Sequence, residues 1–291
     1  MTAASGSGPQ KSLLPDGRRL HLNHGPIDLI IEAFGSRAER EACYWRAVSR
    51  FEGLLDSLVG DLSELRSPDP GPVSDPVSKR MLQAIKPHNS HFVTPMAAVA
   101  GAVADEVCAA MVDGSNIERA YVNNGGDIAF YLTPGNRMRT AIASSFEQSD
   151  SIEISHKDAV RGIATSGWRG RSWSFGIADS VTVLAGSAAA ADVAATLIAN
   201  AVDLPGHKAV TRTAANQLDP DSDLGERLVT TGVGVLERRD IEFALNRGLE
   251  SADTMLEAGQ IKAAALYLAG ETRFCGHIAL DRIREKEPAY G

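Results

Sequence analysis

The sequence lacks several features that would place it in a familiar class. It has only three cysteines, Cys43, Cys108 and Cys275, which lie far apart and form no CxxC pair. This pattern argues against a disulfide framework and against a zinc ribbon, and it fits a reducing compartment. No apolar run reaches the roughly 18 residues that cross a bilayer, because polar side chains interrupt even the most apolar window, residues 188–202. We therefore expect no transmembrane helix.

Positive charge is also scarce. Lys and Arg number 29 against 37 Asp and Glu, which gives a net charge of −8. A protein whose main partner is a polyanion carries the opposite sign, so we expect no nucleic acid partner. The first dozen residues have the composition of neither a secretion signal nor a structural element. We predict a flexible tail over residues 1–15 and a cytoplasmic protein that binds a small molecule, and we leave open whether it forms a homo-oligomer.

The composition is that of a globular protein, with 44% hydrophobic and 23% charged residues. Periodicity predicts helices over 38–65, 77–85, 94–112, 188–200 and 239–256, and strands within 20–34 and over 120–123, 128–132, 139–143, 180–184 and 264–268. Because these elements interleave without a regular βαβ rhythm, we predict an α+β fold with a mixed or antiparallel sheet flanked by helices. A proline-rich connector at 67–76 comes too early to separate two domains, so we expect one domain over 16–291.

The helix predicted over 188–200 carries the most informative spacing. Asp192, Thr196 and Asn200 lie at i, i+4 and i+8, on one face of an otherwise apolar helix. A carboxylate and a hydroxyl one turn apart are hard oxygen ligands that suit Mg²⁺ or Ca²⁺. The alternative is that Asp192 caps the first turn of its own helix, and the spacing alone favours this structural role.

Two turns rich in small residues are further candidates. Ala164-Thr165-Ser166-Gly167 offers successive backbone N–H groups that can cradle phosphate oxygens, although such segments are more often plain turns. In the NNGGD segment at 123–127 the glycines suit a tight hairpin, which leaves Asp127 either to bind backbone N–H groups or to face a ligand.

Other common sites are poorly supported. His88 and His91 form an HxxH pair with no acidic or cysteine partner at a metal-binding spacing, so we favour a solvated pair. The chain has neither a GxSxG elbow nor a Walker loop.

Taken in order, these segments resemble the ApbE-like superfamily, whose best-known members are flavin transferases that use FAD and Mg²⁺ to place FMN on a Thr or Ser of another protein. The small-residue stretch TPMAAVAGAVAD, which ends at Asp105, precedes a strand and a GGD turn, as in that family. The TSG turn at 165–167 then leads through Asp179 to an SVTV strand and an Ala-Asp-x-x-x-Thr helix. The match covers about residues 94–200, a little over a third of the chain.

The resemblance implies a Mg²⁺ site with Asp192 and Thr196 as side-chain ligands and a backbone carbonyl around residues 97–99 as a third. It further implies that the ligand is FAD, FMN or another diphosphate-containing molecule. The residues that it implies for ligand contact are Thr165, Ser166, Gly167, Gly125, Gly126 and Asp105, and those for catalysis are Asp127 and Asp179.

The departures from the family pattern are equally informative. Ala100 stands where the transferases have the Lys of an Ala-Lys-Gly sequence, and Gly176-Ile177-Ala178-Asp179-Ser180 replaces a His-Ile-x-Asp-Pro segment. The insert that helps to enclose the flavin is shortened, so the chain resembles a compact, uncharacterised branch. Three hypotheses follow: a Mg²⁺-dependent transferase or hydrolase acting on a flavin, a divergent enzyme that binds a small metabolite through His91, Arg161 or Arg169, and a flavin-binding protein without turnover.

Overall fold

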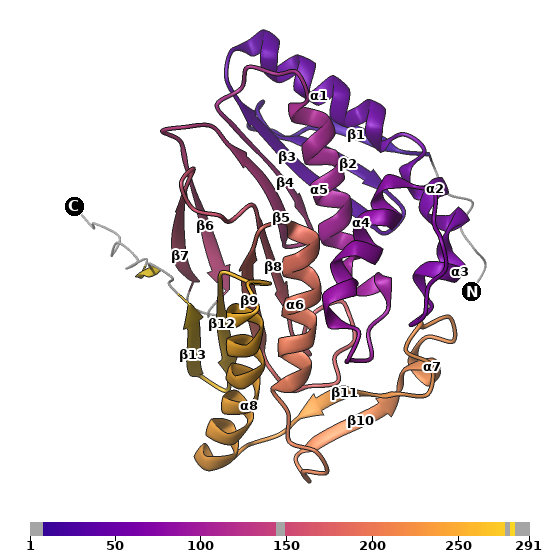
Figure 1. Ribbon diagram of the computed structural model, residues 1–291, viewed down its shortest axis with the longest axis vertical. Coiled ribbons are helices and arrows are strands. Elements are labelled where there is room, and N and C mark those ends of the chain that lie inside the picture. The colour runs from indigo at the N-terminus through magenta and orange to yellow at the C-terminus, as the bar shows by residue number, and fades with distance from the viewer. Residues whose placement is uncertain (1–7, 144–148, 277–279, 283–291) are drawn as a thin grey trace.

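The computed structural model describes residues 8–143, 149–276 and 280–282. Within this part of the chain a nine-stranded sheet runs through the molecule in the order β1-β2-β3-β4-β5-β8-β9-β12-β13 (Figure 1), and every pairing in it is antiparallel. Its strands are β1 (Gln10–Leu13), β2 (Leu20–His24), β3 (Ile27–Phe34), β4 (Arg119–Asn124), β5 (Asp127–Leu132), β8 (Gly162–Ser166), β9 (Ser180–Ala185), β12 (Ala263–Leu268) and β13 (Glu271–Gly276).

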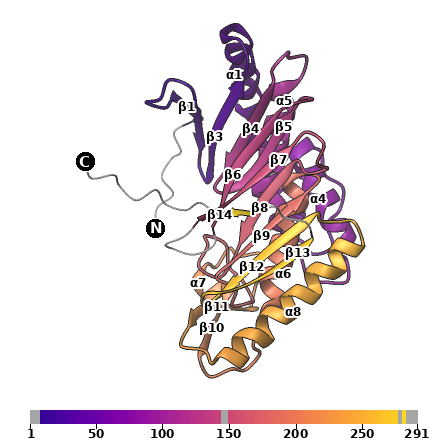
Figure 2. The same ribbon diagram turned by 90° about the vertical axis from the view of Figure 1, so that its left-hand side faces the viewer.

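Two smaller sheets accompany the large one. β10 (Val210–Ala214) pairs with β11 (Leu228–Val233), and β7 (Ser149–Ser155) lies between β6 (Arg137–Ala143) and β14 (Leu280–Arg282). Met138 of β6 and Ile152 and Ile154 of β7 bury a second core together with Phe130 and Leu132 of β5. Figure 2 shows this smaller sheet on the face of the large sheet that is opposite the helices.

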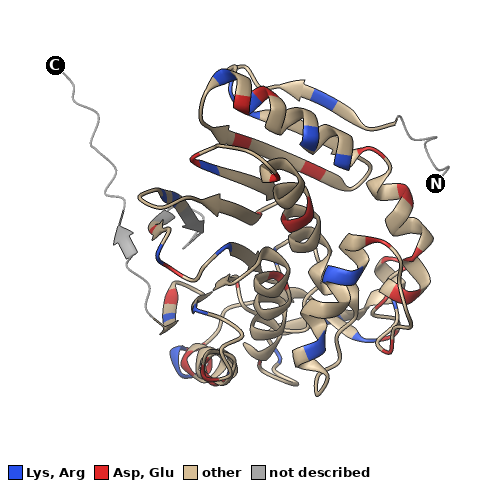
Figure 3. Cartoon of the chain, turned by 45° about the horizontal axis from the view of Figure 1, so that its top comes forward, with Lys and Arg blue, Asp and Glu red and all other residues tan. Residues whose placement is uncertain are grey.

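Helices cover the other face of the large sheet and enclose the main core. Those in contact with the strands of this sheet are α1 (Arg37–Phe51), α5 (Val99–Val112), α6 (Ala188–Ala201) and α8 (Arg238–Glu257). The described residues also form α2 (Leu54–Gly60), α3 (Leu62–Leu65), α4 (Pro76–Ile85), α7 (Ala215–Leu218) and the short 3₁₀ turns η1 (Lys86–His88) and η2 (Pro95–Ala98). Charged residues gather on the outer elements, whereas the central helices are mostly uncharged (Figure 3).

One segment, Pro95–Val112, is long and apolar enough to cross a membrane by length and composition alone, although we expected no such run from the sequence. It comprises η2 and α5, and α5 packs against β4, β5 and α6 in the interior. The core helix of a globular protein passes the same test, and this is the setting that the fold gives to α5.

Glycines let α6 contact its neighbours backbone to backbone. A Cβ atom at Gly101 of α5 would lie 2.3 Å from the carbonyl oxygen of Ala188, and one at Gly162 of β8 would lie 2.1 Å from the Ala188 nitrogen. The small residues of this region therefore bring another part of the backbone close, at the point where α5, α6 and β8 meet.

The α+β fold with an antiparallel sheet is confirmed, but several element boundaries differ from the predictions. The helix predicted over 38–65 is divided at Gly53, whose φ of 76° ends α1 and begins α2. Residues 162–166, interpreted from sequence as a turn, form the strand β8, which lies between β5 and β9 inside the sheet. Two strands, β13 and β14, follow the strand predicted over 264–268 and were not predicted from the sequence.

The predicted flexible tail, residues 1–15, contains β1. Its four exposed residues pair with β2 from Gln10 opposite Asn23 to Leu13 opposite Leu20. An edge strand can be held by backbone hydrogen bonds alone, so its side chains need no apolar pattern, and for this reason its sequence does not predict it. Residues 1–7 of the predicted tail lie outside the described residues.

Candidate functional site

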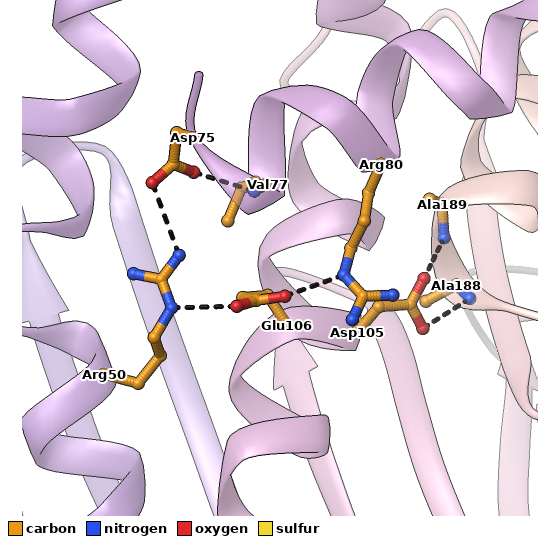
Figure 4. Close-up of polar contacts among 8 residues, drawn as sticks. All are labelled: Arg50, Asp75, Val77, Arg80, Asp105, Glu106, Ala188 and Ala189. Carbon is orange, nitrogen blue, oxygen red and sulfur yellow. Dashed lines mark hydrogen bonds and ion pairs between the residues drawn. The ribbon is translucent and has the colours of Figure 1, made fainter. Parts of the chain in front are cut away.

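Two aspartates join the N-terminal turns of α5 and α6. Asp105 of α5 accepts hydrogen bonds from the backbone N–H groups of Ala188 and Ala189, each at 2.9 Å (Figure 4). Asp192 of α6 accepts one from the N–H of Gly101 at 3.0 Å. The first N–H groups of a helix have no partner within it, so each carboxylate caps the other helix. These contacts also make the two helices antiparallel where they cross.

The structure does not support the alternative in which Asp192 caps the first turn of its own helix. The N-cap of α6 is Ser187, whose hydroxyl accepts from the N–H of Ala190 at 3.2 Å, so Asp192 does not cap its own helix. Asn200, two turns further on, accepts from Phe175 N–H at 2.8 Å and from the Ser174 hydroxyl at 3.0 Å. Asn200 therefore holds the loop before β9 and does not extend the polar face toward Asp192.

Asp127 completes a pair of carboxyl groups with Asp192. It follows the Gly125-Gly126 turn, where φ is 65° and 116°, and its Oδ1 accepts from the N–H of Thr165 at 3.2 Å. Asn124 fixes the turn to the start of α5, because its side-chain amide donates to the carbonyl of Ala100 at 3.1 Å. The Asp127 carboxyl group lies close enough to the Asp192 carboxyl group for each to act on the pKa of the other, so residues far apart in the sequence meet where β5, β8, α5 and α6 converge.

The electrostatics of this carboxyl pair are unusual. Burial raises the pKa of Asp127 to about 7, against the opposing effect of the Thr165 N–H. Burial, and then the charge of Asp127, raise the pKa of Asp192 well above its ordinary value, while the N–H groups of Gly101 and Ala100 act in the other direction. Two neighbouring carboxylates repel each other, so the pair either shares a proton or takes up a cation.

The donor set around the pair fits a hard divalent cation. Thr196 lies one turn beyond Asp192, and its hydroxyl forms no hydrogen bond with another residue of the described ranges. The turn η2 packs against α6, and the antiparallel crossing places it toward the Thr196 end. Carboxylate, hydroxyl and carbonyl oxygens are the ligands that Mg²⁺ accepts, with water completing its shell. Where the structure is described, no three His, Cys, Asp or Glu side chains cluster as metal ligands.

The TSG turn contacts the Asp127–Asp192 pair through its backbone, because the Thr165 N–H donates to Asp127. The Thr165 hydroxyl makes a 2.9 Å hydrogen bond with the Thr182 hydroxyl, whereas Ala164 packs in the core on the helix side. Because side chains alternate along a strand, Thr165 points away from the helices and Ser166 points toward them. A Cβ at Gly167 would lie 2.5 Å from the carbonyl oxygen of Asp179, so this position needs glycine for close approach.

Asp105 and Asp179, two further predicted site residues, have their oxygens engaged by the protein. Both oxygens of Asp105 cap α6. Asp179 Oδ1 pairs with Arg169 Nε at 3.0 Å, and Oδ2 accepts from the N–H of Ala269 at 2.7 Å. These contacts give both aspartates a structural role, and their predicted roles in ligand contact and catalysis stay predictions.

Arg171, which was not among the candidates from the sequence, lies beside the Gly125-Gly126 turn. A Cβ at Gly125 would come within 1.9 Å of Arg171 Nη2, so the guanidinium group rests on this turn. Its positive charge acts to lower the pKa of Asp127. In the sequence, Arg171 is the second of two arginines that follow the TSG turn, and the hypotheses drawn from the sequence name only the first, Arg169.

The histidine pair forms no metal site with acidic residues in the described part of the chain. His88 is buried, and burial lowers its pKa. His91 hydrogen-bonds through Nδ1 to the Ser90 hydroxyl at 3.1 Å. Arg161, named for the alternative enzyme hypothesis, donates to the carbonyls of His156, Asp158 and Val160.

A cavity of about 480 Å³ lies on the other face of the sheet, away from the carboxyl pair. Its lining includes Glu32, Tyr121 and Arg139, and the Tyr121 hydroxyl donates to Glu32 at 3.2 Å. Burial, followed by the charge of Glu32, raises the pKa of Tyr121 to about 12. Tyr121 and Glu32 are thus paired with each other, and Arg139 Nε donates to the Ser151 hydroxyl at 3.0 Å.

Comparison with known proteins gives relatives of two kinds. The chain is 39% identical to a UPF0280 protein of Methanothrix thermoacetophila over 128 residues, which are 44% of this chain and 52% of that protein. It is 37% identical to a UPF0280 protein of Methanococcoides burtonii over 135 residues, 46% of this chain and 55% of that protein. The chain thus spans about half the length of the curated relatives it matches.

Among solved structures, a variant of the flavin transferase ApbE from Vibrio cholerae matches with a TM-score of 0.47 and 16% identity, over 92% of this chain and 97% of that one. The flavinyl transferase ApbE of Pseudomonas stutzeri matches with a TM-score of 0.46 and 11% identity, over 94% and 96%. A family model described as AbpE bacteria matches residues 11–274. Since this match covers most of the chain, the protein belongs to that bacterial family, within the ApbE-like superfamily.

Proposed function

We propose that the protein is a Mg²⁺-dependent enzyme that acts on FAD, FMN or another diphosphate-containing ligand, as a transferase or a pyrophosphatase. The observation that carries the proposal is the neighbouring pair of carboxyl groups, Asp127 and Asp192, beside the TSG turn. Family membership and the order of the motifs support the choice of a flavin ligand.

In this proposal Asp192, Asp127 and Thr196 hold the cation. Bound Mg²⁺ supplies charge neutralisation for a diphosphate and for its leaving phosphate. The Thr165 N–H holds Asp127 in place, and the Gly101 N–H orients Asp192. The two carboxyl groups are therefore positioned before any ligand binds, which reduces the cost of organising the site.

The turns provide the ligand contacts. The N–H groups of Gly125 and Gly167 are suited to bind phosphate oxygens. The Gly126 N–H already donates to the Asn123 side chain at 2.8 Å, and Ser166 pairs with Val181 of β9. Asp179 bonds Arg169 Nε and the N–H of Ala269, which gives it a structural role apart from these ligand contacts. We further propose a cytoplasmic location and a small-molecule substrate, with no nucleic acid partner, in keeping with the net charge of −8.

The test is turnover of FAD. Full-length protein is incubated with FAD and Mg²⁺, or with FAD and EDTA, and the products are separated by chromatography. Release of FMN and AMP, or FMN attached to an acceptor protein, is expected only with Mg²⁺. Asp192→Asn should lower the rate at least about 100-fold, whereas Asp56→Asn, which changes an exposed carboxylate of α2, should not change it.

Other results would contradict the proposal. Binding of FAD without products would favour a flavin-binding protein. Neither binding nor turnover would favour the divergent small-metabolite enzyme.

A further inference from the structure

We propose that Arg171 is the cationic contact for a phosphate group of the ligand bound at the Asp127–Asp192 pair. This inference rests on the proposed function and identifies the part of the ligand that the loop after the TSG turn recognises. The chemical class is a phosphate or diphosphate ester, bound through the guanidinium group.

The two central helices lack a cation. Neither α5 nor α6 contains a Lys or Arg residue. A diphosphate beside two carboxylates adds negative charge to a site that is already negative. One divalent ion does not balance this charge, so a positively charged side chain nearby favours ligand binding.

Arg171 lies where such a cation is needed. Its guanidinium group rests on the Gly125-Gly126 turn, and it is close enough to act on the charge of Asp127. Arg171 is exposed and forms no hydrogen bond or ion pair with the residues that the structure describes. Its donors are therefore free for a ligand, and the planar fork of a guanidinium group matches two phosphate oxygens.

Arg169 lies only two positions before Arg171, but other residues of the protein bind its guanidinium group. Its Nε pairs with Asp179 at 3.0 Å, and its guanidinium group stacks on the ring of Trp168, 4.4 Å from the centroid. Arg169 is thus engaged by the protein. The two arginines make a matched pair, one engaged and one available, in the same loop.

Gly125 provides an independent way to displace Arg171 without removing its charge. Its φ of 65° suits Gly or Asn, and any side chain there would collide with Arg171 Nη2. Gly17 has a similar φ of 66°, and a Cβ added there would meet no atom within 4 Å. Gly17→Asn is therefore the control for Gly125→Asn.

The experiment measures binding of three probes, FAD, ADP and riboflavin, by calorimetry in the presence of Mg²⁺. Arg171→Gln should weaken FAD and ADP at least about tenfold and leave riboflavin, which has no phosphate, unchanged. Arg171→Lys should restore part of the loss. Gly125→Asn should weaken ADP as well, whereas Arg169→Gln and Gly17→Asn should stay within about twofold of the wild type. Thermal melts of each variant confirm that it is folded.

The outcomes separate this inference from the proposed function. If the wild type binds FAD and Arg171→Gln binds ADP equally well, the contact is wrong and the proposed function stands. If Arg169→Gln and Arg171→Gln weaken ADP to the same extent, a general charge effect replaces the specific contact. If the wild type binds neither FAD nor ADP, both the proposed function and the contact are overturned.

Discussion

At the scale of single residues, three aspartates of one neighbourhood differ in what their oxygens contact. Asp105 has both oxygens bonded to backbone N–H groups at 2.9 Å, which leaves it a helix cap. Asp127 and Asp192 each accept from the backbone but also face one another. Residue type alone does not distinguish them, so the assignment of a metal site depends on this contact between carboxyl groups.

The TSG turn allows a test of which atoms of Thr165 matter. Thr165→Val removes the hydroxyl that bonds Thr182 on the far face of the sheet but keeps the N–H that Asp127 accepts from. We expect the increase in melting temperature on adding Mg²⁺ to be unchanged. The free energy of unfolding should fall by about 1 kcal/mol, because the buried Thr182 hydroxyl loses its partner. Loss of the Mg²⁺ effect in this variant would place the hydroxyl in the site.

At the scale of elements, the contact between α5 and α6 depends on the absence of side chains. A Cβ at Gly101 would meet the carbonyl oxygen, the carbonyl carbon and the nitrogen of the chain at residues 188–189, all within 2.7 Å. Since these are backbone atoms, they cannot move aside as a flexible side chain can. The same crossing brings the Gly101 N–H to Asp192, so packing and site geometry are coupled.

Gly101→Ala should therefore destabilise the protein. We expect the free energy of unfolding in urea to fall by about 1–3 kcal/mol or more, as for other overpacked cores. The control is Gly60→Ala at the end of α2, where a Cβ meets nothing within 4 Å and the change should be neutral or stabilising by up to about 1 kcal/mol. Equal stability of the Gly101→Ala variant and the wild type would contradict the backbone contact.

Helices α1, α4 and α5 are joined by ion pairs centred on Glu106 (Figure 4). Glu106 accepts from Arg50 Nε at 2.9 Å and from Arg80 Nε at 2.8 Å. Burial acts to raise the pKa of Glu106, but the two guanidinium groups outweigh it, and the pKa lies below its ordinary value. A carboxylate of this kind stabilises the folded state above its unfolded pKa, and the contribution is lost as the pH falls through the folded pKa.

We predict a pH-dependent difference between the wild type and Glu106→Gln. At pH 7 the variant should be less stable by about 1–3 kcal/mol. The difference should shrink below about pH 4.5, as Glu106 of the wild type becomes protonated. Urea unfolding at a series of pH values provides the measurement, and a difference that stays constant down to pH 3 would show that the charge of Glu106 does not contribute.

At the scale of the whole molecule, the order of the strands decides what the sequence could predict. Helices such as α6 and α8 follow from their periodicity, and the α+β class follows from the mixture of elements. β8 was not recognised because Gly162 and Ser166 are typical of turns, yet Gly162 is needed there to admit the backbone of α6. Local propensity contains no information about such a tertiary contact.

The candidate site, too, has a part that the sequence indicated and a part that depends on the pairing of the strands. The order of the motifs indicated Asp127 and Asp192, but the proximity of Arg171 to Gly125 depends on β5 pairing with β8, with Ile128 opposite Ile163. Only the register of that pairing brings the loop after β8 to the turn before β5. The sequence therefore indicated the two aspartates of the candidate site but not the arginine that lies beside them.

The central claim, that Asp127 and Asp192 together hold a divalent cation, is tested most directly by calorimetric titration of Mg²⁺ into the full-length protein and its variants. We predict one Mg²⁺ per chain for the wild type and for Asp56→Asn. Both Asp192→Asn and Asp127→Asn should bind Mg²⁺ at least about tenfold more weakly. Wild-type affinity in either site variant, or no binding by the wild type, would contradict the claim.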